Sequence, residues 1–333
     1  MQWKAAAAAV VPLLFWAVQS LAQPAGLDAF RRPDTVPFPE NAPYDRGIAT
    51  LGKMLFFDPR LSGAQNISCS SCHNPSFGWE TPVPKAIGAA DKPVHRHAPT
   101  ILNVAWITPL FWDGRAASLE EQAVGPITAP DEMNASFEDI IIRLTAVTEY
   151  KAWFERLFPG QGIRKETILA ALATYQRTIV SGVAGFDRWV GGDANAVPEA
   201  AKRGFALFTG RANCASCHSG WMFTDNNMHD IGLHTTDLGS GGLAPQDTAR
   251  YFRFKTPGLR NIALRAPYMH DGSLPSLPEV IRHYANGGAS GVTRQIDIEG
   301  FAASEGDIAD LIAFLETLTD NETNVPTPIL PAN

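Results

Sequence analysis

Residues 69–73 read Cys-Ser-Ser-Cys-His, and residues 214–218 read Cys-Ala-Ser-Cys-His. Together the two segments contain all four cysteines of the chain. In such a segment the two thiols can bond to the vinyl groups of one haem, and the adjacent histidine can bind its iron. One copy alone could be a zinc or dithiol site, but two copies in an exported chain argue against that. The sequence therefore predicts two covalently bound haem c groups, with iron ligands His73 and His218 and attachment points Cys69, Cys72, Cys214 and Cys217.

The first 22 residues have the pattern of a secretory signal peptide. Lys4 precedes an apolar run over residues 5–18, and Ser20-Leu21-Ala22 forms a small-x-small cleavage pattern. We expect cleavage near Ala22/Gln23 and a periplasmic mature protein. The apolar run is too short for a stable membrane span after leader removal, although a retained anchor is an alternative. With every cysteine assigned to haem, no thiol is left for a disulfide.

Composition and charge restrict the class of partner. The chain has 27 Lys and Arg against 34 Asp and Glu, a formal net charge of −7, and loss of Lys4 with the leader makes this one unit more negative. We therefore expect no nucleic-acid partner. A mature chain of roughly 310 residues suits two modest domains. The 28 glycines and 25 prolines indicate long ordered loops between short helices.

The haem segments lie in a weak internal repeat. Residues 52–56 (Gly-Lys-Met-Leu-Phe) precede the first, and residues 204–208 (Gly-Phe-Ala-Leu-Phe) precede the second. The simplest explanation is a duplicated haem domain.

Helical periodicity dominates the rest of the chain. Apolar residues have helical spacing over 137–158, 163–180 and 308–318, and a further helix is delimited by Pro198 and Gly210. Alternating strand patterns are scarce. The predicted fold class is mostly α, with two cytochrome c-like haem domains and long ordered loops.

Further segments carry a family resemblance. Phe-Trp-Asp-Gly-Arg at 111–115 is followed by Glu121-Gln122 and Gly125-Pro126. Nearer the C-terminus stand Thr-Pro-Gly-Leu-Arg-Asn at 256–261, Ala-Pro-Tyr-Met-His-Asp-Gly at 266–272 and Ser-Leu-Pro-Glu-Val at 276–280. From about Asp45 to Thr319, the chain resembles the bacterial dihaem cytochrome c peroxidase family. The haem segments alone would indicate only a c-type cytochrome, and the combination makes the resemblance specific.

The resemblance also implies a division of the chain. We expect a signal peptide over 1–22, an N-terminal peroxidatic haem domain over 23–182, a C-terminal electron-transfer haem domain over 183–327 and a tail over 328–333. The join between the haem domains is expected near residues 181–195.

The sixth ligand of the C-terminal haem separates two branches of this family. Its position falls in the segment 281–288, where Tyr284 stands in place of the methionine expected in ordinary peroxidases of the family. A phenolate is a hard, anionic oxygen donor that stabilises oxidised iron. In this respect the chain resembles the MauG-like branch, in which tyrosine binds the C-terminal haem.

The residues alone also allow other side chains as the sixth ligand of that haem. Neighbours on a helix point about 100° apart, so His283 and Tyr284 cannot both face the iron. The family position favours Tyr284 over the remaining alternatives, which are Met269, His270, His229 and His234.

The resemblance implies an open face on the N-terminal haem. The family loop that can bring a distal histidine falls at residues 86–90, which contain none. His95 is an alternative ligand, although a solvated loop histidine is the simpler interpretation. Glu132 and Gln122 match the family's two distal residues, which move a proton between the peroxide oxygens. Pro126 matches the residue that closes the pocket between them.

Two tryptophan positions bear on electron transfer. The resemblance places Trp112 between the two haems, where an indole can relay an oxidising equivalent. The MauG-like branch has a surface tryptophan two residues before the second haem segment, and Ala212 stands there instead. Trp221 is the nearest replacement, with packing at the haem edge as its alternative role.

A calcium ion between the haems is a further candidate cofactor. The resemblance implies the backbone carbonyls of Arg265 and Pro267 as ligands, together with an asparagine side chain. His97 holds the asparagine position, and because calcium prefers oxygen ligands this departure counts against the site.

The implied function is that of a periplasmic dihaem oxidoreductase. Hydrogen peroxide would oxidise the His73 haem, and a high-valent state shared through Trp112 with the His218/Tyr284 haem would oxidise a partner protein by long-range electron transfer. Tryptophan is the expected target, and the methylamine dehydrogenase precursor is one candidate partner. One alternative is a dihaem cytochrome c peroxidase that takes electrons from a small cytochrome or cupredoxin. Another is a non-catalytic dihaem electron-transfer cytochrome.

Overall fold

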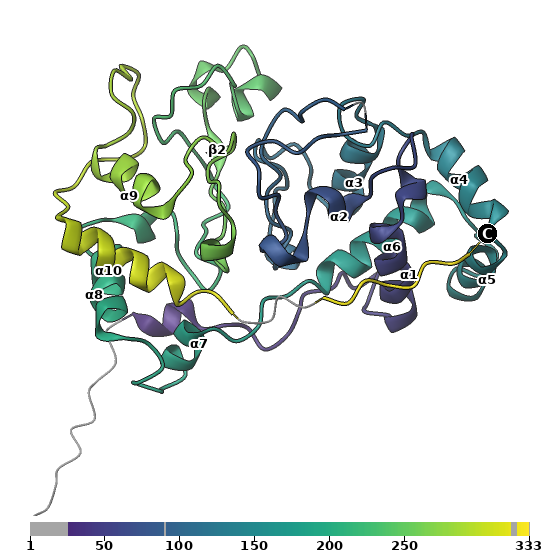
Figure 1. Cartoon of the computed structure of the whole chain (residues 1–333), viewed down its shortest axis with the longest axis horizontal. Helices are drawn as coiled ribbons and strands as arrows, with labels where there is room; N and C mark the ends of the chain where they lie inside the picture. The colour runs from purple at the N-terminus through teal and green to yellow at the C-terminus, as the bar shows by residue number, and fades with distance from the viewer. Residues whose placement is uncertain (1–25, 90, 321–324, 333) are drawn as a thin grey trace, which may run out of the picture.

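The computed structural model describes residues 26–89, 91–320 and 325–332. The predicted signal peptide lies outside these ranges. Within them the chain is mostly helical, as predicted, and forms two lobes side by side (Figure 1). A search of the described helices finds none that is both long and apolar enough to cross a membrane.

The first lobe contains α1 (Arg46–Phe57), α2 (Cys69–Cys72), α3 (Leu119–Thr128), α4 (Phe137–Ala146), α5 (Thr148–Leu157) and α6 (Lys165–Arg177). The second lobe contains α7 (Gly185–Val190), α8 (Glu199–Thr209), α9 (Leu277–Ala285) and α10 (Glu305–Glu316). It also holds two antiparallel strands, β1 (Met228–His229) and β2 (Phe254–Lys255). Short 3-10 helices punctuate the loops at Leu27–Phe30, Pro59–Leu61, Pro75–Phe77, Val104–Trp106, Cys214–Ser216, Ser240–Leu243, Thr248–Arg250 and Ile262–Leu264.

The predicted helices are present, with one correction. Helix α8 begins after Pro198 and ends just before Gly210, α6 lies within the predicted span 163–180, and α10 overlaps the predicted span 308–318. The span 137–158 is wrong as a single helix, because Val147 has an extended backbone and separates α4 from α5. Val147 is itself buried, so the apolar pattern continues across the break and hides it.

The repeat before each haem segment marks a close helix crossing. Gly52 on α1 meets α6, and a Cβ atom there would lie 1.9 Å from the carbonyl oxygen of Ala171. Gly204 on α8 meets α10 in the same way, with a Cβ atom 1.9 Å from the carbonyl oxygen of Asp310. Both crossings require glycine, since any side chain would overlap the facing backbone. Each lobe therefore contains the same pair of crossed helices.

Each lobe has its own hydrophobic core, and each end of the described chain packs against the lobe that lies farther away in the sequence. Leu27 and Phe30, near the start of the described chain, pack in the core of the second lobe. Val325 and Leu330 pack against the first lobe, where Pro331 accepts a hydrogen bond from Arg60 Nη2 at 2.9 Å. Figure 1 shows this last segment in yellow along the first lobe. The predicted domain boundaries stay a prediction.

Two long loops at the lobe boundary have the same local structure. Asn103 and Asn261 have left-handed backbones, with φ of 60° and 57°, and each begins a 3-10 helix. Further along, Phe111 and Met269 both have positive φ. The end of each loop closes through a backbone bridge, Leu110 to Ala116 in the first lobe and Tyr268 to Leu274 in the second.

These matching loops bind one another through equivalent hydrogen bonds. The backbone N–H of His97 donates to the carbonyl of His270 at 2.8 Å. The backbone N–H of Lys255 donates to the carbonyl of Trp112, also at 2.8 Å. His97 and Lys255 therefore occupy equivalent positions, as do Trp112 and His270. This contact joins the two lobes through equivalent loops.

Candidate functional site: two haem cavities

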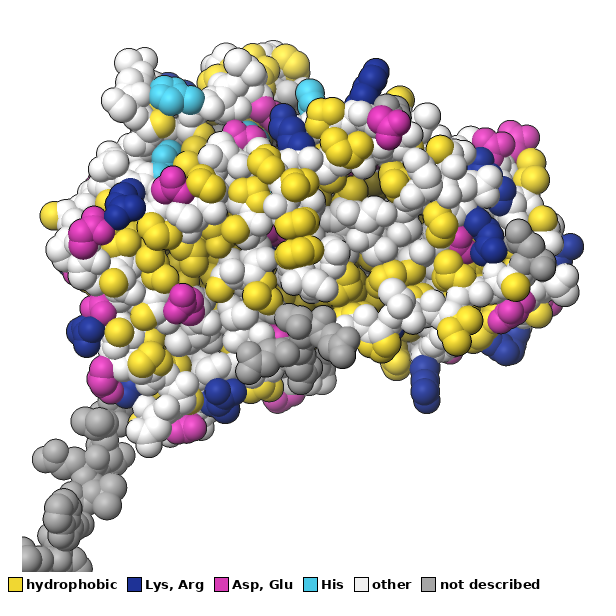
Figure 2. Space-filling model, in the orientation of Figure 1, with side chains coloured by type: hydrophobic (Ala, Val, Ile, Leu, Met, Phe, Trp, Pro, Cys, Tyr) yellow, Lys and Arg dark blue, Asp and Glu magenta, His cyan; other side chains and the backbone are white. Residues whose placement is uncertain are grey.

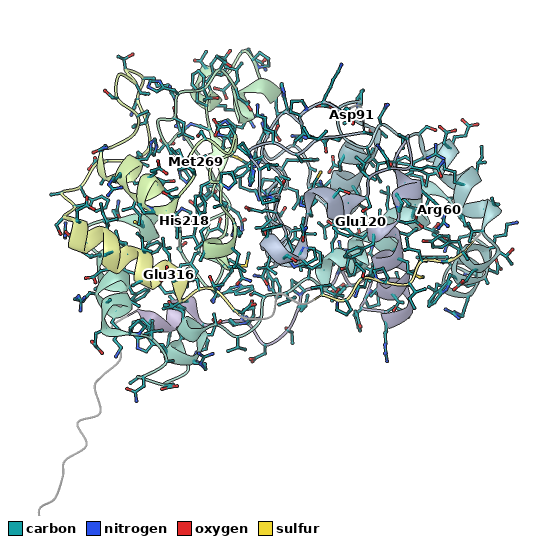
Figure 3. The ribbon with its side chains drawn as sticks, viewed as in Figure 1. Arg60, Asp91, Glu120, His218, Met269 and Glu316 are labelled. Atoms are coloured by element: carbon teal, nitrogen blue, oxygen red, sulfur yellow. The ribbon has the colours of Figure 1, made fainter. Side chains whose placement is uncertain are left out.

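A cavity of about 180 Å³ lies behind the second haem segment and holds Cys214, Cys217 and His218 on its wall. His218, labelled in Figure 3, has Nδ1 2.9 Å from the carbonyl oxygen of Phe223. This bond orients the ring and leaves Nε2 for a metal. Burial lowers the pKa of His218, which favours the neutral form that binds iron. The remaining lining is mainly apolar, for example Phe208, Leu259, Ile262, Val280 and Ile281.

Helix α9 presents Tyr284 to this cavity and turns His283 away. Tyr284 lines the cavity with His218, whereas Nε2 of the buried His283 lies 2.7 Å from the carbonyl oxygen of Ile231. Burial raises the pKa of Tyr284, so a phenolate there needs a nearby positive charge such as ferric iron. The placement of Tyr284 agrees with the expected ligand position.

Three of the other candidate ligands line the cavity, and the histidines among the candidates have contacts of their own. Met269, His270 and His229 line the cavity. The ring of His270 stacks on Phe254 with centroids 3.7 Å apart. His234 has Nε2 2.9 Å from the carbonyl oxygen of Ser290 and is not among the lining residues.

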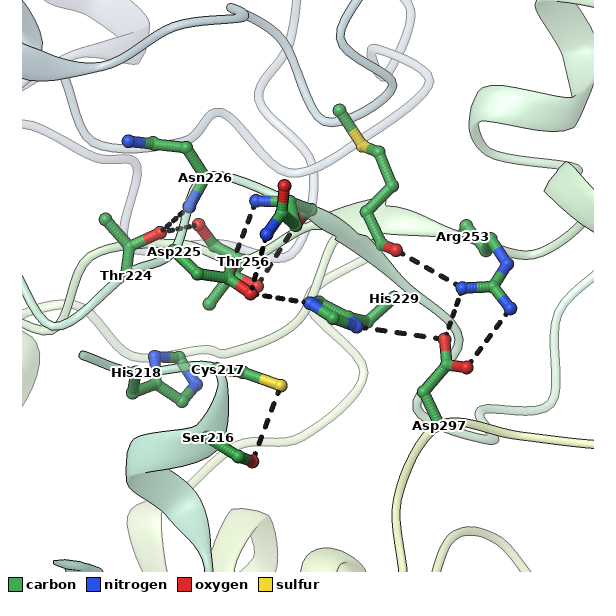
Figure 4. A network of polar contacts seen from close by, with 12 residues as sticks. Ser216, Cys217, His218, Thr224, Asp225, Asn226, His229, Arg253, Thr256 and Asp297 are labelled. Atoms are coloured by element: carbon green, nitrogen blue, oxygen red, sulfur yellow. Dashed lines mark hydrogen bonds and ion pairs between the residues drawn. The ribbon is translucent and has the colours of Figure 1, made fainter.

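A polar network surrounds His229 at the edge of this cavity (Figure 4). His229 Nε2 lies 2.8 Å from Asp225 Oδ2, and Nδ1 lies 3.8 Å from Asp297 Oδ2. Arg253 holds Asp297 in turn at 2.6 Å. Across the described ranges, Cys217, Asp225 and His229 form the one cluster with metal-ligand geometry. Since Cys217 is assigned to haem attachment, we assign no separate ion to this cluster.

The first haem segment lines a pair of adjoining cavities. Cys72 and His73 line both, one of about 60 Å³ and the other of about 440 Å³. Gln122, Pro126 and Glu132 also lie on both walls. The structure thus brings the three predicted distal residues together beside the first haem segment.

Local folding explains how these distal residues converge. Helix α3 begins at Ser118, whose side chain accepts a hydrogen bond from the backbone N–H of Glu121, and it carries Gln122 and Pro126. The chain then turns back, and the backbone N–H of Met133 donates to the carbonyl of Pro126 at 2.9 Å. This turn places Glu132 opposite the helix.

The environment of Glu132 suits proton transfer. Burial raises the pKa of Glu132, the charge of Asp131 raises it further, and Arg115 opposes both effects. A carboxyl group with a raised pKa holds a proton more readily than an ordinary one, which suits it to accept a proton and then return it. The opposite histidine, His73, has Nδ1 3.3 Å from the carbonyl oxygen of Trp79, and burial lowers its pKa.

The loop over residues 86–89 contributes Gly88 to the smaller cavity, and Ala90 lies outside the described residues. His95 is exposed and lines the larger cavity. No histidine of the described chain lines the smaller cavity apart from His73. The predicted open face stays a prediction that this arrangement supports.

Trp112 lines both the 440 Å³ cavity and the cavity of the second haem segment. Its indole Nε1 donates a hydrogen bond to the carbonyl of His97 at 2.8 Å. The side chain therefore lies between the two haem sites with a fixed orientation, in the place expected for a relay.

The other predicted tryptophan lies elsewhere. Trp221 lines neither haem cavity and packs edge-on against Trp106, with centroids 4.8 Å apart. The guanidinium carbons of Arg32 and Arg260 each lie 5.6 Å from its centroid. Nearby positive charge disfavours removal of an electron from an indole, which counts against Trp221 as a relay. Ala212 is buried.

The residues expected to bind calcium line one cavity, but His97 lacks an oxygen ligand, and the ion stays a prediction. His97, Arg265 and Pro267 all line the second cavity. However, His97 Nδ1 already lies 3.1 Å from the carbonyl oxygen of Pro84, and Nε2 faces Glu80. The guanidinium of Arg265 donates to the same carboxylate at 3.0 Å. His97 thus offers no oxygen ligand where the family has an asparagine, so we derive no step from calcium.

Sequence reasoning missed two charged residues near the second cavity, Glu80 and Lys255. Glu80 follows the tryptophan whose carbonyl orients His73. Lys255 is the counterpart of His97 in the second loop. Aligning residues 97–116 with residues 255–274 is the signal that would have identified Lys255.

The 180 Å³ cavity beside residues 214–218 and the 60 Å³ cavity beside residues 69–73 both have walls that suit a covalently attached haem. Each has two cysteines and a histidine on its wall, a backbone carbonyl that orients the histidine, and, in the second, a mainly apolar lining. An apolar lining suits a porphyrin ring.

Comparisons with known proteins agree with this arrangement. Residues 46–195 match the family model described as di-haem cytochrome c peroxidase, and residues 201–319 match cytochrome c. The chain is 50% identical to the methylamine utilization protein MauG of Methylorubrum extorquens, over 91% of this chain and 86% of that protein. It is 43% identical to MauG of Methylophilus methylotrophus, with 91% and 92% covered. The crystal structure of a MauG-like protein associated with microbial copper homeostasis has a TM-score of 0.81 and 32% identity, with 88% and 95% covered.

Proposed function

Because this chain belongs to the di-haem cytochrome c peroxidase family, we propose that it uses hydrogen peroxide to oxidise a tryptophan residue of a partner protein. The chain is a haem-dependent oxidoreductase of the peroxidase type and carries two c-type haems. The observation that carries the proposal is the position of Tyr284 on the wall of the His218 cavity. A phenolate at this place favours oxidised iron over the reduced iron that an ordinary peroxidase stores.

The proposed roles of the side chains follow from their positions. When bound, the haems supply peroxide reduction and one-electron transfer. His73 and His218 would hold the two irons, and a backbone carbonyl orients each ring. Glu132 accepts a proton from the peroxide oxygen nearer the iron and returns it to the departing oxygen. Gln122, on the same wall, orients the peroxide by hydrogen bonding.

Long-range transfer then connects the chemistry to a partner. Trp112 lines both haem sites and provides an indole through which electrons pass between them. The partner therefore need not enter a deep pocket. Two relatives are called methylamine utilization proteins, so the methylamine dehydrogenase precursor is the first partner to test. The leader pattern at residues 1–22 supports a periplasmic encounter with the partner.

The decisive experiment adds one equivalent of hydrogen peroxide to the fully ferric protein without prior reduction. We expect rapid loss of the resting haem spectrum, followed by slow return. Adding the methylamine dehydrogenase precursor should accelerate the return, and mass spectrometry should find an oxidised tryptophan in that protein. If the ferric protein reacts only after one haem has been reduced, the chain is an ordinary cytochrome c peroxidase.

The matched variant is Tyr284→Met, which installs the residue expected in ordinary peroxidases of the family. We expect it to lose the reaction in the ferric state and to regain peroxide turnover after one-electron reduction. Unchanged reactivity of the ferric variant would contradict the proposed role of Tyr284.

A further inference from the structure

Lys255 has an unusual position between the two haem sites. It lies in the short strand β2, and its backbone N–H bonds to the carbonyl of Trp112 across the lobe boundary. Its side chain lines both the cavity of the second haem segment and the 440 Å³ cavity beside the first. The side chain of Lys255 can therefore contact a group bound in either cavity.

Nearby charged side chains at this boundary are buried or half-buried and have ion-pair partners. Arg265 pairs with Glu80 at 3.0 Å. Arg96 Nη1 lies 2.6 Å from Asp113 Oδ2, and its Nε lies 2.7 Å from Asp237 Oδ2. These contacts neutralise the charges that the lobes bring together, as is usual for buried ionised groups.

The Lys255 ammonium is the exception. No hydrogen bond or ion pair joins it to any residue in the described ranges, whereas its counterpart His97 is bonded through both ring nitrogens. Burial alone lowers the pKa of Lys255 to about 8. An ammonium that is partly withdrawn from water and has no counter-ion is costly, so the position favours an anion that the protein chain does not itself supply.

Each haem carries two propionate carboxylates, which are anions that the bound cofactors would bring to this boundary. We propose that the Lys255 ammonium binds a propionate carboxylate of one of the two haems. The bond fixes the orientation of that haem beside Trp112 and adds a positive charge near its iron. Lys255 is thus a positioning residue, tied to Trp112 through its backbone and to a haem through its side chain. The proposal rests on the two haems and is independent of peroxide or a partner.

The test compares Lys255→Met with Lys255→Arg in the haem-loaded protein. Haem content is measured first, and a spectroscopic redox titration then resolves both haem potentials. Loss of a positive charge makes ferrous haem harder to form. In Lys255→Met we expect at least a tenfold rise in the oxidised-to-reduced ratio of one haem at fixed potential, which is about 59 mV for a one-electron couple. Lys255→Arg should keep the potential close to that of the parent.

The haem whose potential shifts identifies the source of the propionate. Lys92→Met is the control, because it removes one positive charge from an exposed lysine, and we expect no comparable shift. Unchanged potentials in Lys255→Met, or equal shifts in both Lys255 variants, would overturn the proposal. If Lys255→Met fails to take up haem, a crystal structure of the parent holoprotein decides. A propionate oxygen within about 3.2 Å of Nζ supports the bond, and its absence refutes it.

Discussion

The two proximal histidines show how single residues prepare each iron site. His73 and His218 each direct Nδ1 toward a carbonyl five or six residues later, of Trp79 and Phe223. The bond fixes the ring and increases the basicity of the other nitrogen. The same histidine–carbonyl contact occurs in both lobes. The two iron sites are therefore expected to differ in the residues on the side of the iron opposite the histidine.

Tyr284 supplies that difference in the second lobe and gives the first prediction. Tyr284→Phe removes only the hydroxyl, and we expect the absorption and electron paramagnetic resonance spectra of the C-terminal haem to change, because the iron loses an oxygen ligand. Tyr268→Phe is the matched control. Tyr268 lines the same cavity, but its hydroxyl donates to the carbonyl of Ile262 at 3.1 Å. Identical spectra in Tyr284→Phe and the parent would exclude tyrosine ligation.

Glu132 gives a prediction about pH. Its pKa is raised by burial and by Asp131, and only the ionised form accepts a proton. The rate of the peroxide reaction should therefore fall as pH decreases through this raised pKa. Glu132→Gln should lower the rate by about 100-fold or more and remove the pH dependence.

Asp131→Asn separates this effect from simple disruption. Removing the neighbouring negative charge should lower the pKa of Glu132, so the pH at which the rate is half-maximal should move to lower values. Stopped-flow rates over a pH series measure both variants. A midpoint that stays in place in Asp131→Asn, or persists in Glu132→Gln, would show that another group controls the rate.

For single residues, the sequence predicted those site residues whose role follows from a local pattern. The cysteine and histidine spacing within residues 69–73 and 214–218 predicted both attachment sites, and the family resemblance placed Glu132 at the first. Lys255 and Glu80 were missed because their significance depends on contacts between lobes. Neither residue has a local pattern that distinguishes it from an ordinary surface charge.

At the element scale, the helix pairs α1/α6 and α8/α10 carry the lobes. Helical spacing predicted α6 and α10 because each buries one apolar face, whereas Pro198 and Gly210 delimited α8 and no pattern predicted α1. It did not reveal the break at Val147, since that residue continues the buried face. It also could not show that Gly52 and Gly204 mark the crossings, because the facing carbonyls come from residues more than a hundred positions away.

The crossings give a prediction about stability. Gly204→Ala would place a methyl group 1.9 Å from the carbonyl oxygen of Asp310, so α8 and α10 must separate. We expect a loss of about 1–3 kcal/mol in the free energy of unfolding. Gly306→Ala in α10 is the control. A Cβ atom there would lie 3.6 Å from its nearest neighbour, Ser304 Oγ, so alanine should be neutral or stabilising. Denaturant titration of the haem-loaded proteins measures both, and equal stabilities would show that the crossing tolerates a side chain.

At the scale of the whole molecule, the lobes are joined by exchanged chain ends and by the paired loops around Trp112 and His270. On the face shown in Figure 2, charged side chains of both signs are scattered, and hydrophobic side chains gather around the middle where the lobes meet. The duplicated haem segments predicted two lobes. The mutual contact of the loops could not be predicted, because equivalent segments in separate domains carry no local signal for pairing.

The ion pair between Glu80 and Arg265 joins the two lobes and gives the last prediction. The two side chains are 5% and 3% exposed, and Glu80 also accepts a hydrogen bond from the backbone N–H of Thr100 at 2.9 Å. Glu80→Gln leaves a buried guanidinium without its anion, so we expect a loss of about 3–5 kcal/mol in the free energy of unfolding. Glu199→Gln, which breaks an exposed pair with Lys202, should cost at most about 1 kcal/mol.

The cost of Glu80→Gln should arise from the unpaired charge rather than from the lost contact, and a double variant tests this. Glu80→Leu/Arg265→Met replaces both charges with apolar side chains, and removing a buried pair together is often close to neutral. We therefore expect the double variant to recover most of the stability that Glu80→Gln loses, as measured by denaturant titration at matched haem content. A double variant as unstable as Glu80→Gln would instead show that the ion pair itself holds the two haem lobes together.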